Sequence, residues 1–250
     1  MKPKLTLVGA GPGDPDLITL KGIKALNEAK VVLYDALANE ALLSHAPQDA
    51  LKIFVGKRGG QRSVPQERIN QLILSYASVF GNVVRLKGGD PFIFGRGKEE
   101  LDFAKRFGIE IEVVPGISSA TGLTATQGIS LTERGIADGF WVLTASLRDN
   151  KFNEDLRIAA RSNSTVVVLM GVRFISRIAE EFRNEGKDNL PVLVIQEGST
   201  ANEKVISTTV GRLIADAQIN KIKAPAVIVL GEVARHENLT KFQPLLAALN

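Results

Sequence analysis

The stretch that decides the fold covers residues 63–86 and reads SVPQERINQLILSYASVFGNVVRL. Ser63 and Gln66 form a capping-box pattern, and Pro65 is typical of the first turn of a helix. Apolar side chains then recur at helical spacing and predict one continuous stripe, formed by Ile69, Leu72, Ile73, Tyr76, Ala77 and Phe80. A short apolar run, 83–86, follows almost at once. The stretch therefore predicts a helix that leads directly into a strand.

The rest of the first half repeats this alternation. Short, mostly apolar runs that resemble 83–86 occur at 5–8, 31–34, 53–55 and 111–114. Such runs are typical of parallel strands whose two faces are both covered. Strands that alternate with helices predict right-handed crossovers and a mainly parallel sheet.

The second half predicts a different sheet. Its strand-like runs are 140–143, 165–169, 192–195, 205–209 and 226–230. The loop between 195 and 205 leaves no room for a helix, so these two strands are expected to pair antiparallel in a mixed sheet. Pro115-Gly116 and the Gly/Ser/Thr-rich stretch after it mark the boundary. We expect two α/β domains, residues 1–116 and 117–250.

Composition limits the function classes. The chain has 250 residues, 44% of them hydrophobic, with no cysteine and only two histidines, His45 and His236. This excludes disulfide scaffolds and thiolate zinc sites, and it argues against a histidine metal site or a Ser-His-Asp triad. With no signal-peptide pattern and no long apolar run, we expect a cytoplasmic protein that does not bind membranes.

The net charge of +4 leaves two interpretations open. The basic residues are spread along the chain and aromatic residues make up only 6%, so nucleic-acid binding is not expected. A mild positive balance suits a small polyanionic substrate, but an ordinary solvated surface explains it equally well.

A glycine-rich turn follows the first strand. Residues 9–14 read GAGPGD and resemble a dinucleotide fingerprint, but Asp14 stands where the third glycine is required. Pro12 removes a backbone donor, and Asp14 would repel a pyrophosphate. The turn therefore lets a ligand approach the backbone without suiting phosphate, and a purely structural turn explains it equally well.

The loop after the strand at 83–86 is more informative. Residues 88–97 read GGDPFIFGRG. Gly88 and Gly89 let main-chain groups face a ligand, and Asp90 supplies an acceptor for an ammonium group or a ribose hydroxyl. Ile93 and the two phenylalanines could exclude water. The alternative, a loop around a buried phenylalanine pair, is less favoured.

These loops together resemble the tetrapyrrole methylase family. The matching motifs are residues 8–14 (VGAGPGD), 34–35 (YD), 55–58 (VGKR), 88–97 and 114–119 (VPGISS). Matching positions extend from Leu7 to about Glu232, so the resemblance covers nearly the whole chain. The glycine-rich turn at 9–14 alone is not specific for this family, but the combination of the five motifs is.

The resemblance implies a fold and an activity. It implies two α/β domains with S-adenosylmethionine bound in the cleft between them, usually in a homodimer. The implied reaction is C-methylation of a small-molecule tetrapyrrole, uroporphyrinogen III, to precorrin-2, for sirohaem or cobalamin synthesis, with S-adenosylhomocysteine as the product of the cofactor. The family's cofactor contacts fall on Pro12, Gly88, Gly89, Asp90, Ile93, Ser118, Ser119, Met170, Gly198 and Ala226. Met170 alone would more often be a core residue, but its place before Gly171, after a strand, favours the cofactor.

The family's proposed proton acceptor and donor fall on Asp35 and Lys57. A carboxylate suits the loss of a proton from the methylated ring. Without the family resemblance, the favoured interpretation is that Asp35 is a helix cap and Lys57 a surface charge. A further alternative is that Lys57 and Arg58 pair with substrate carboxylates. No metal is implied.

One departure from the family affects the substrate. Residues 130–135 read SLTERG where the family pattern is PLTHRD, so Glu133 places an anion near the expected tetrapyrrole entrance. Another precorrin methyltransferase is therefore the main alternative. Less favoured are the diphthamide or ribosomal RNA methylase branches, a nicotinamide-dependent oxidoreductase and a non-catalytic module that binds an adenosyl ligand.

Overall fold

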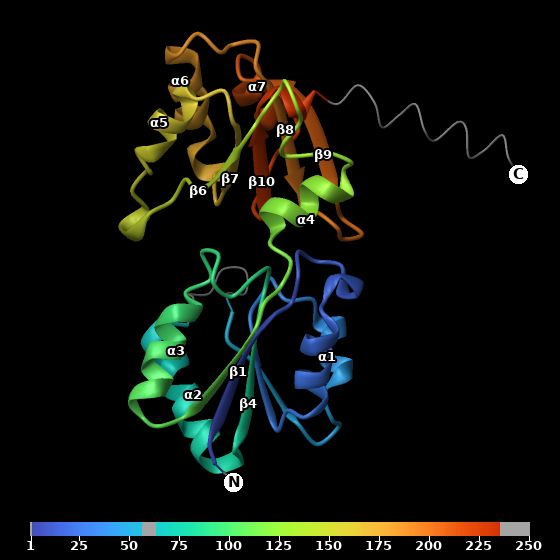
Figure 1. The fold of residues 1–250 in the computed structure, drawn as a ribbon, viewed down its shortest axis with the longest axis vertical. Helices are drawn as coiled ribbons and strands as arrows, with labels where there is room; N and C mark the ends of the chain where they lie inside the picture. The colour runs from blue at the N-terminus through green and yellow to red at the C-terminus, as the bar shows by residue number, and fades with distance from the viewer. Residues whose placement is uncertain (1, 57–63, 236–250) are drawn as a thin grey trace, which may run out of the picture. The chain divides into compact units, whose positions relative to one another are not determined.

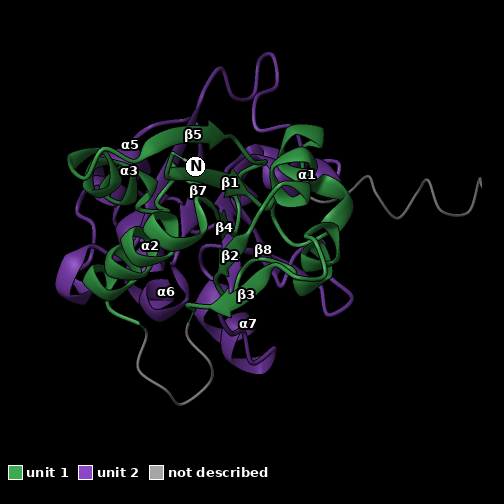
Figure 2. Cartoon of the chain, turned by 90° about the horizontal axis from the view of Figure 1, so that it is seen from below, with its two compact units in different colours: residues 1–118 green, residues 119–250 purple. Residues whose placement is uncertain are grey.

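The structure is a computed structural model that describes residues 2–56 and 64–235. The chain divides into two compact units, residues 1–118 and 119–250, which are coloured separately in Figure 2. Each unit has its own sheet and its own cores, so each is considered by itself.

The first unit contains a parallel sheet. Its strands lie in the order β3-β2-β4-β1-β5 (Figure 2), and every neighbouring pair is parallel. The adjacent strands β1 and β4 are labelled in Figure 1. Their bounds are β1 Lys4–Gly9, β2 Val31–Tyr34, β3 Leu51–Phe54, β4 Asn82–Lys87 and β5 Glu110–Val114. The predicted strands are confirmed, each to within two residues at either end.

Helices cover both faces of this sheet. Helix α1 (Leu20–Asn27) and the short 3-10 helices η1 (Pro15–Leu17) and η2 (Glu40–His45) follow β1 and β2. Val84 and Leu86 of β4 pack in the core on the α1 and η2 side, whereas Val83 packs on the side of α2 (Gln66–Phe80) and α3 (Gly97–Arg106). Because side chains alternate along a strand, Arg85 and Lys87 share the α2 and α3 side with Val83.

Helix α2 follows the predicted pattern except at its ends. The helix begins at Gln66 with Pro65 as its N-cap, and among the residues that the structure describes no side chain forms a capping hydrogen bond. The other half of the predicted capping box, Ser63, lies outside the described residues. The side-chain amide of Gln66 donates to Asn70 and to Glu100, at 3.2 and 3.1 Å. At the other end, Phe80 is exposed and contacts Tyr76, because the apolar stripe runs past the end of the core it covers.

The second unit contains the predicted mixed sheet, in the order β6-β7-β10-β8-β9. The strands are β6 Phe140–Thr144, β7 Thr165–Leu169, β8 Pro191–Gln196, β9 Lys204–Thr209 and β10 Ala226–Leu230. Only β6 and β7 pair in parallel; β10 is antiparallel to both β7 and β8. The short connection between β8 and β9 gives the expected antiparallel pair.

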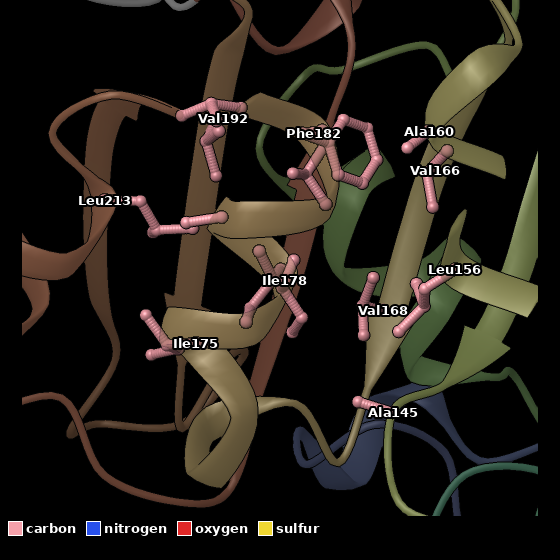
Figure 3. Close-up of a cluster of buried hydrophobic side chains, with 14 of the residues drawn as sticks. Ala145, Leu156, Ala160, Val166, Val168, Ile175, Ile178, Phe182, Val192 and Leu213 are labelled. Carbon is pink, nitrogen blue, oxygen red and sulfur yellow. The ribbon is translucent and has the colours of Figure 1, made fainter. Parts of the chain in front are cut away.

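Two cores lie on the two faces of this second sheet. On one face Ile178 and Phe182, from the helix Ile175–Asn184, pack on Val166 and Val168 of β7 (Figure 3), and two further helices join this core. On the other face Leu123 of α4 packs on the opposite side of the same strands. The helices are α4 Ser119–Thr126, α5 Asp155–Arg161, α6 Ile175–Asn184 and α7 Leu213–Ile219, with 3-10 helices η3 Arg148–Asn150, η4 Val172–Phe174 and η5 Glu232–Ala234.

The fold class is thus a two-unit α/β protein with one parallel and one mixed sheet. Over the described ranges, every helix is too short or too polar to cross a bilayer.

Candidate functional site

Three loops meet at the carboxyl edge of the first sheet through glycine backbone. Gly11 and Gly89 exchange hydrogen bonds, with N···O distances of 3.3 Å from Gly11 and 2.7 Å from Gly89. A Cβ on Gly116 would lie 2.3 Å from the carbonyl oxygen of Gly89 and 2.7 Å from the Cα of Gly9. The loops after β1, β4 and β5 can therefore touch only because these positions have no side chain.

Gly88 allows a fourth loop to join them. A Cβ there would lie 2.4 Å from the Cβ of Leu37, in the turn after β2. Asn39 in that turn donates from its side chain to the carbonyl of Gly13, at 2.8 Å. The structure thus brings the turn that holds Pro12 together with Gly88 and Gly89, and it gives both glycines a packing role.

Asp90 links two of these loops. Its Oδ1 accepts the N–H of Phe92 at 2.8 Å, and its Oδ2 accepts the N–H of Gly116 at 3.0 Å. Each oxygen keeps a lone pair for another donor. Asp90 therefore both orders the edge of the sheet and remains available to a ligand.

The same edge exposes several large apolar side chains. Phe92, Ile93 and Phe94 are each more than two-fifths exposed, and so is Leu37. The alternative of a buried phenylalanine pair is therefore wrong. Phe94 and Arg96 adopt positive φ values of 53° and 58°, which are uncommon for residues with a side chain. Apolar groups held on strained backbone beside exposed main-chain groups are typical of a ligand-binding loop.

Asp35 lies at the end of β2, on the same edge. Its Oδ2 forms an ion pair with Nη2 of Arg85 at 3.2 Å, and its Oδ1 accepts the N–H of Leu37 at 3.2 Å. The N–H of Gly88 lies 3.5 Å from the same Oδ1. About a quarter of the Asp35 side chain is exposed. Asp35 is not the cap of the helix that follows, because the N-cap of η2 is Asn39. Asp35 accepts a backbone N–H of its own turn and also keeps a carboxylate open to a ligand.

The lysine predicted to be its partner, Lys57, lies outside the described residues, as does Arg58.

Beneath Asp35 lies a charged cluster that the sequence analysis missed. Arg85, Lys87 and Glu100 are all buried, and Glu100 is fully so. Oε1 of Glu100 accepts from Nε of Arg85 at 3.3 Å and from Nζ of Lys87 at 3.1 Å. Burial, followed by the like charge of Arg85, lowers the pKa of Lys87 from its ordinary value. The available signal was charge within a strand covered on both faces, because buried charges require partners.

In the second unit, three predicted cofactor residues share one edge of the sheet. Met170 directly follows β7, Gly198 follows β8, and Ala226 begins β10, paired in register with Gln196. Since β10 runs antiparallel between β7 and β8, its start lies beside their ends. The structure therefore brings these three positions together.

The backbone at this edge is strained. Met170 has a φ of 53°, and the neighbours of Gly198, Glu197 and Ser199, have φ values of 48° and 57°. Met170 is half exposed, so it is not a core residue. A Cβ on Gly198 would lie 2.6 Å from the side chain of Leu123 in α4.

Ser118 and Ser119 lie where the two units join in sequence. Ser118 is buried at the end of the first unit, and Ser119 is the first residue of α4. Glu133 lies in a small hairpin, where it exchanges backbone hydrogen bonds with Ala137, and its side chain is exposed. No ion pair joins Glu133 to Arg134 in the described structure.

The sequence comparisons point to one family. A family model described as Tetrapyrrole (Corrin/Porphyrin) Methylases matches residues 4–214. The chain is 43% identical to the uroporphyrinogen-III C-methyltransferase of Methanocaldococcus jannaschii over 235 residues, covering 93% of this chain and 97% of that protein. It is 40% identical to the siroheme synthase of Nitrosomonas europaea, over 94% of this chain but only 50% of that protein. The chain therefore spans about half the length of this siroheme synthase.

Solved structures agree with the sequence comparisons. Uroporphyrin-III C-methyltransferase from Thermus thermophilus, complexed with S-adenosylhomocysteine, has a TM-score of 0.80 at 43% identity, covering 93% of this chain and 99% of that chain. A cobalt precorrin-4 methyltransferase has a TM-score of 0.82 at 30% identity, covering 92% of this chain and 95% of that chain. Because the family model matches residues 4–214 and a relative of 43% identity covers 93% of the chain, this chain belongs to the tetrapyrrole (corrin/porphyrin) methylase family.

Proposed function

We propose that this chain transfers methyl groups from S-adenosylmethionine to carbon atoms of uroporphyrinogen III, forming precorrin-2 and S-adenosylhomocysteine. The observation that carries the proposal is the nearly end-to-end match to the Methanocaldococcus enzyme, 43% identical with 97% of that protein covered. The Thermus relative, whose structure contains S-adenosylhomocysteine, supports the choice of cofactor.

The residues present fit such a cofactor. In the first unit, main-chain groups of residues 88–93 and the carboxylate of Asp90 offer hydrogen bonds beside exposed apolar Ile93. In the second unit, Met170, Gly198 and Ala226 share one edge of the sheet, where the backbone is strained at Met170 and on both sides of Gly198. Ser118 ends the first unit, and Ser119 begins α4. When bound, the cofactor supplies an electrophilic methyl group on a sulfonium. The protein's share is to align the two reactants and exclude water, which dominates catalysis of such a displacement.

Asp35 is proposed to accept the proton that the methylated ring loses, and Lys57 to act as the donor. The partly exposed carboxylate on the edge of the first sheet supports the role of Asp35. Asp35→Asn should therefore keep its affinity for S-adenosylhomocysteine and lose about 10²–10⁴-fold in turnover. Calorimetry and steady-state kinetics measure the two quantities; wild-type turnover in the variant would leave Asp35 only its backbone contacts.

The proposal extends to the setting of the enzyme. A formal charge of +4 suits a substrate that carries several carboxylates. We also propose that the enzyme works in the cytoplasm as a homodimer, as the family resemblance implies. Light scattering of the purified protein gives the mass of the assembly, and a monomer would contradict the second point.

The experiment that tests the function is a single-turnover reaction with uroporphyrinogen III and methyl-labelled S-adenosylmethionine, with products identified by mass spectrometry. Label on carbon of the tetrapyrrole supports the proposal, and with S-adenosylmethionine in excess over further turnovers the product should carry two labelled methyl groups. Absence of label transfer, in protein that binds S-adenosylhomocysteine, would overturn it.

A second candidate is another precorrin methyltransferase. It is favoured by the similarity in shape to cobalt precorrin-4 methyltransferase and by the unusual Glu133 near the expected substrate entrance. Steady-state kinetics with uroporphyrinogen III and with methylated precorrins separate the two candidates. The true substrate should have the higher kcat/KM.

A further inference from the structure

We propose that Arg85 and Glu100 are positioning residues, which hold the carboxylate of Asp35 in its reactive orientation from below the edge of the sheet. The inference rests on the proposed function, since it takes Asp35 as the proton acceptor. It concerns residues that touch neither the proposed cofactor positions nor the exposed face of Asp35.

Arg85 is held from several directions at once. It is 3% exposed, and its Nη1 donates to the carbonyl oxygens of Leu33 and Leu86, at 3.3 and 3.0 Å. Nε donates to Glu100, and Nη2 reaches Asp35. All three nitrogens of a planar, rigid group are therefore engaged, so its position fixes where Oδ2 of Asp35 can lie.

Glu100 in turn fixes Arg85. Helix α3 carries its side chain into the core, where a single oxygen accepts from Arg85, Lys87 and Gln66. These donors come from β4 and α2, so Glu100 joins the sheet to both helices on that face. A rigid helix on one side and a rigid strand on the other make the orientation of Arg85 independent of the loops above.

Charge balance makes the group interdependent. Arg85 and Lys87 carry positive charge, and Asp35 and Glu100 carry negative charge, so the four ionised groups sum to zero. Removing the charge of Glu100 leaves two buried cations facing the single carboxylate of Asp35, which would then be drawn inward. Because buried charges without partners are costly, the geometry at Asp35 depends on Glu100 although the two do not touch.

The test compares Arg85→Lys and Glu100→Gln, each alone and each combined with Asp35→Asn. Arg85→Lys keeps the charge but lacks the planar fork that reaches both carboxylates, and Glu100→Gln keeps the shape but removes the charge. Each should lower kcat by about 10–100-fold, the scale of a small misplacement of a reacting group. KM for uroporphyrinogen III and the Kd of S-adenosylhomocysteine should stay near the wild-type values.

The decisive readout is the combination with Asp35→Asn. If Arg85 and Glu100 act through Asp35, neither substitution should lower kcat further in the Asp35→Asn background. Losses that multiply independently would overturn the inference, as would wild-type kcat in a folded Arg85→Lys variant. If Glu100→Gln does not fold, Arg85→Lys decides by the same comparison.

A matched control is available in the second unit. Glu181 of α6 is also buried and pairs with two arginines, Arg157 at 3.1 Å and Arg177 at 3.9 Å. Glu181→Gln should lower thermal stability without changing kcat. An equal loss of kcat in this control would mean that any weakened buried ion pair slows the enzyme, and the positioning role would fall. If the wild-type protein does not methylate uroporphyrinogen III, the proposed function itself fails, which the wild-type assay shows first.

Discussion

Asp90 uses both carboxylate oxygens to hold neighbouring backbone, one within its own loop and one in the loop after β5. Asp90 can therefore contribute to ligand binding in two ways. Its remaining lone pairs can accept hydrogen bonds from the ligand, and its bond to Gly116 keeps the loop after β5 in place. The two contributions are lost together when the carboxylate is removed.

We therefore expect Asp90→Ala to weaken binding of S-adenosylhomocysteine by about 1.5–3 kcal/mol, the value of a charge-assisted acceptor. Isothermal titration calorimetry measures the change. Asp90→Asn is the matched control, because it retains one acceptor oxygen and should lose less. An unchanged Kd in folded Asp90→Ala would leave Asp90 a purely structural link.

Glu133, unlike Asp90, has an exposed side chain, and its backbone is held by the bridge to Ala137. If the loop lines the tetrapyrrole entrance, the carboxylate repels those of the substrate by about 1 kcal/mol at ~4 Å in water-like surroundings. Glu133→His should lower KM for uroporphyrinogen III several-fold at low salt, and less at high salt.

The control for this prediction is Glu180→His, an equal change of charge at an exposed position of α6. It should leave KM unchanged. A rise in KM for Glu133→His that persists at high salt would instead mean that Glu133 accepts a hydrogen bond the enzyme uses.

At the scale of elements, features that depend on neighbouring residues in sequence could be predicted, whereas features that depend on distant residues could not. The strands β1, β2 and β4 can be identified from the apolar runs in their own sequence. The spacing of Ile69, Ile73 and Ala77 likewise identifies the buried face of α2. The roles of Arg85 and Gln66 could not be found in this way, because both depend on Glu100, which is 15 and 34 positions away in sequence. The same holds for Asp90, whose partner Gly116 belongs to another strand-to-helix connection.

One carboxylate ties three elements of the first unit together at the surface. Glu112 of β5 pairs with Lys4 of β1 at 2.8 Å and with Lys21 of α1 at 2.9 Å. These hydrogen bonds, Lys4 first and Lys21 second, lower the pKa of Glu112 from its ordinary value. A carboxylate whose pKa is lower in the folded state stabilises the protein above its unfolded pKa, about 4.3, and loses that effect as pH falls through the folded value.

Glu112→Gln should therefore reduce the free energy of unfolding by about 0.5–1 kcal/mol at pH 7, the range for a partly exposed ion pair. The difference from wild type should shrink as pH falls below about 4.3. Urea denaturation at several pH values measures it. Glu110→Gln is the control: its pair with Lys2 is longer, at 3.8 Å, and more exposed, so little change is expected. A deficit that is independent of pH would assign the role of Glu112 to packing.

At the scale of the whole molecule, the chain places its candidate residues at the edges of two sheets with different topologies. The parallel first sheet could be predicted from apolar runs that alternate with helices, and the mixed second sheet from the short connection between β8 and β9. The meeting of Met170 and Ala226 at one edge could not be derived so simply, because it depends on β10 running between β7 and β8. The family resemblance supplied what the pattern did not.

Ligand binding should appear as stabilisation of the whole chain. S-adenosylhomocysteine at 100 times its Kd should add about 2.7 kcal/mol to the free energy of unfolding. For a protein of this size each kcal/mol raises Tm by about 2–4 °C, which differential scanning calorimetry resolves. NADH at the same concentration should have no effect. Stabilisation by NADH in place of S-adenosylhomocysteine would favour the oxidoreductase alternative.

The contact between Gly9 and Gly116 also restricts how the gene can change. A Cβ at Gly9 would lie 2.5 Å from the Cα of Gly116. The backbone of residue 9 fixes the position of that Cβ, and the Cα is itself backbone, so neither atom can rotate away. Every amino acid reachable from a glycine codon by one nucleotide change carries a Cβ. In a library made by error-prone amplification and selected for folded protein, these two codons should therefore vary only at their third, synonymous base.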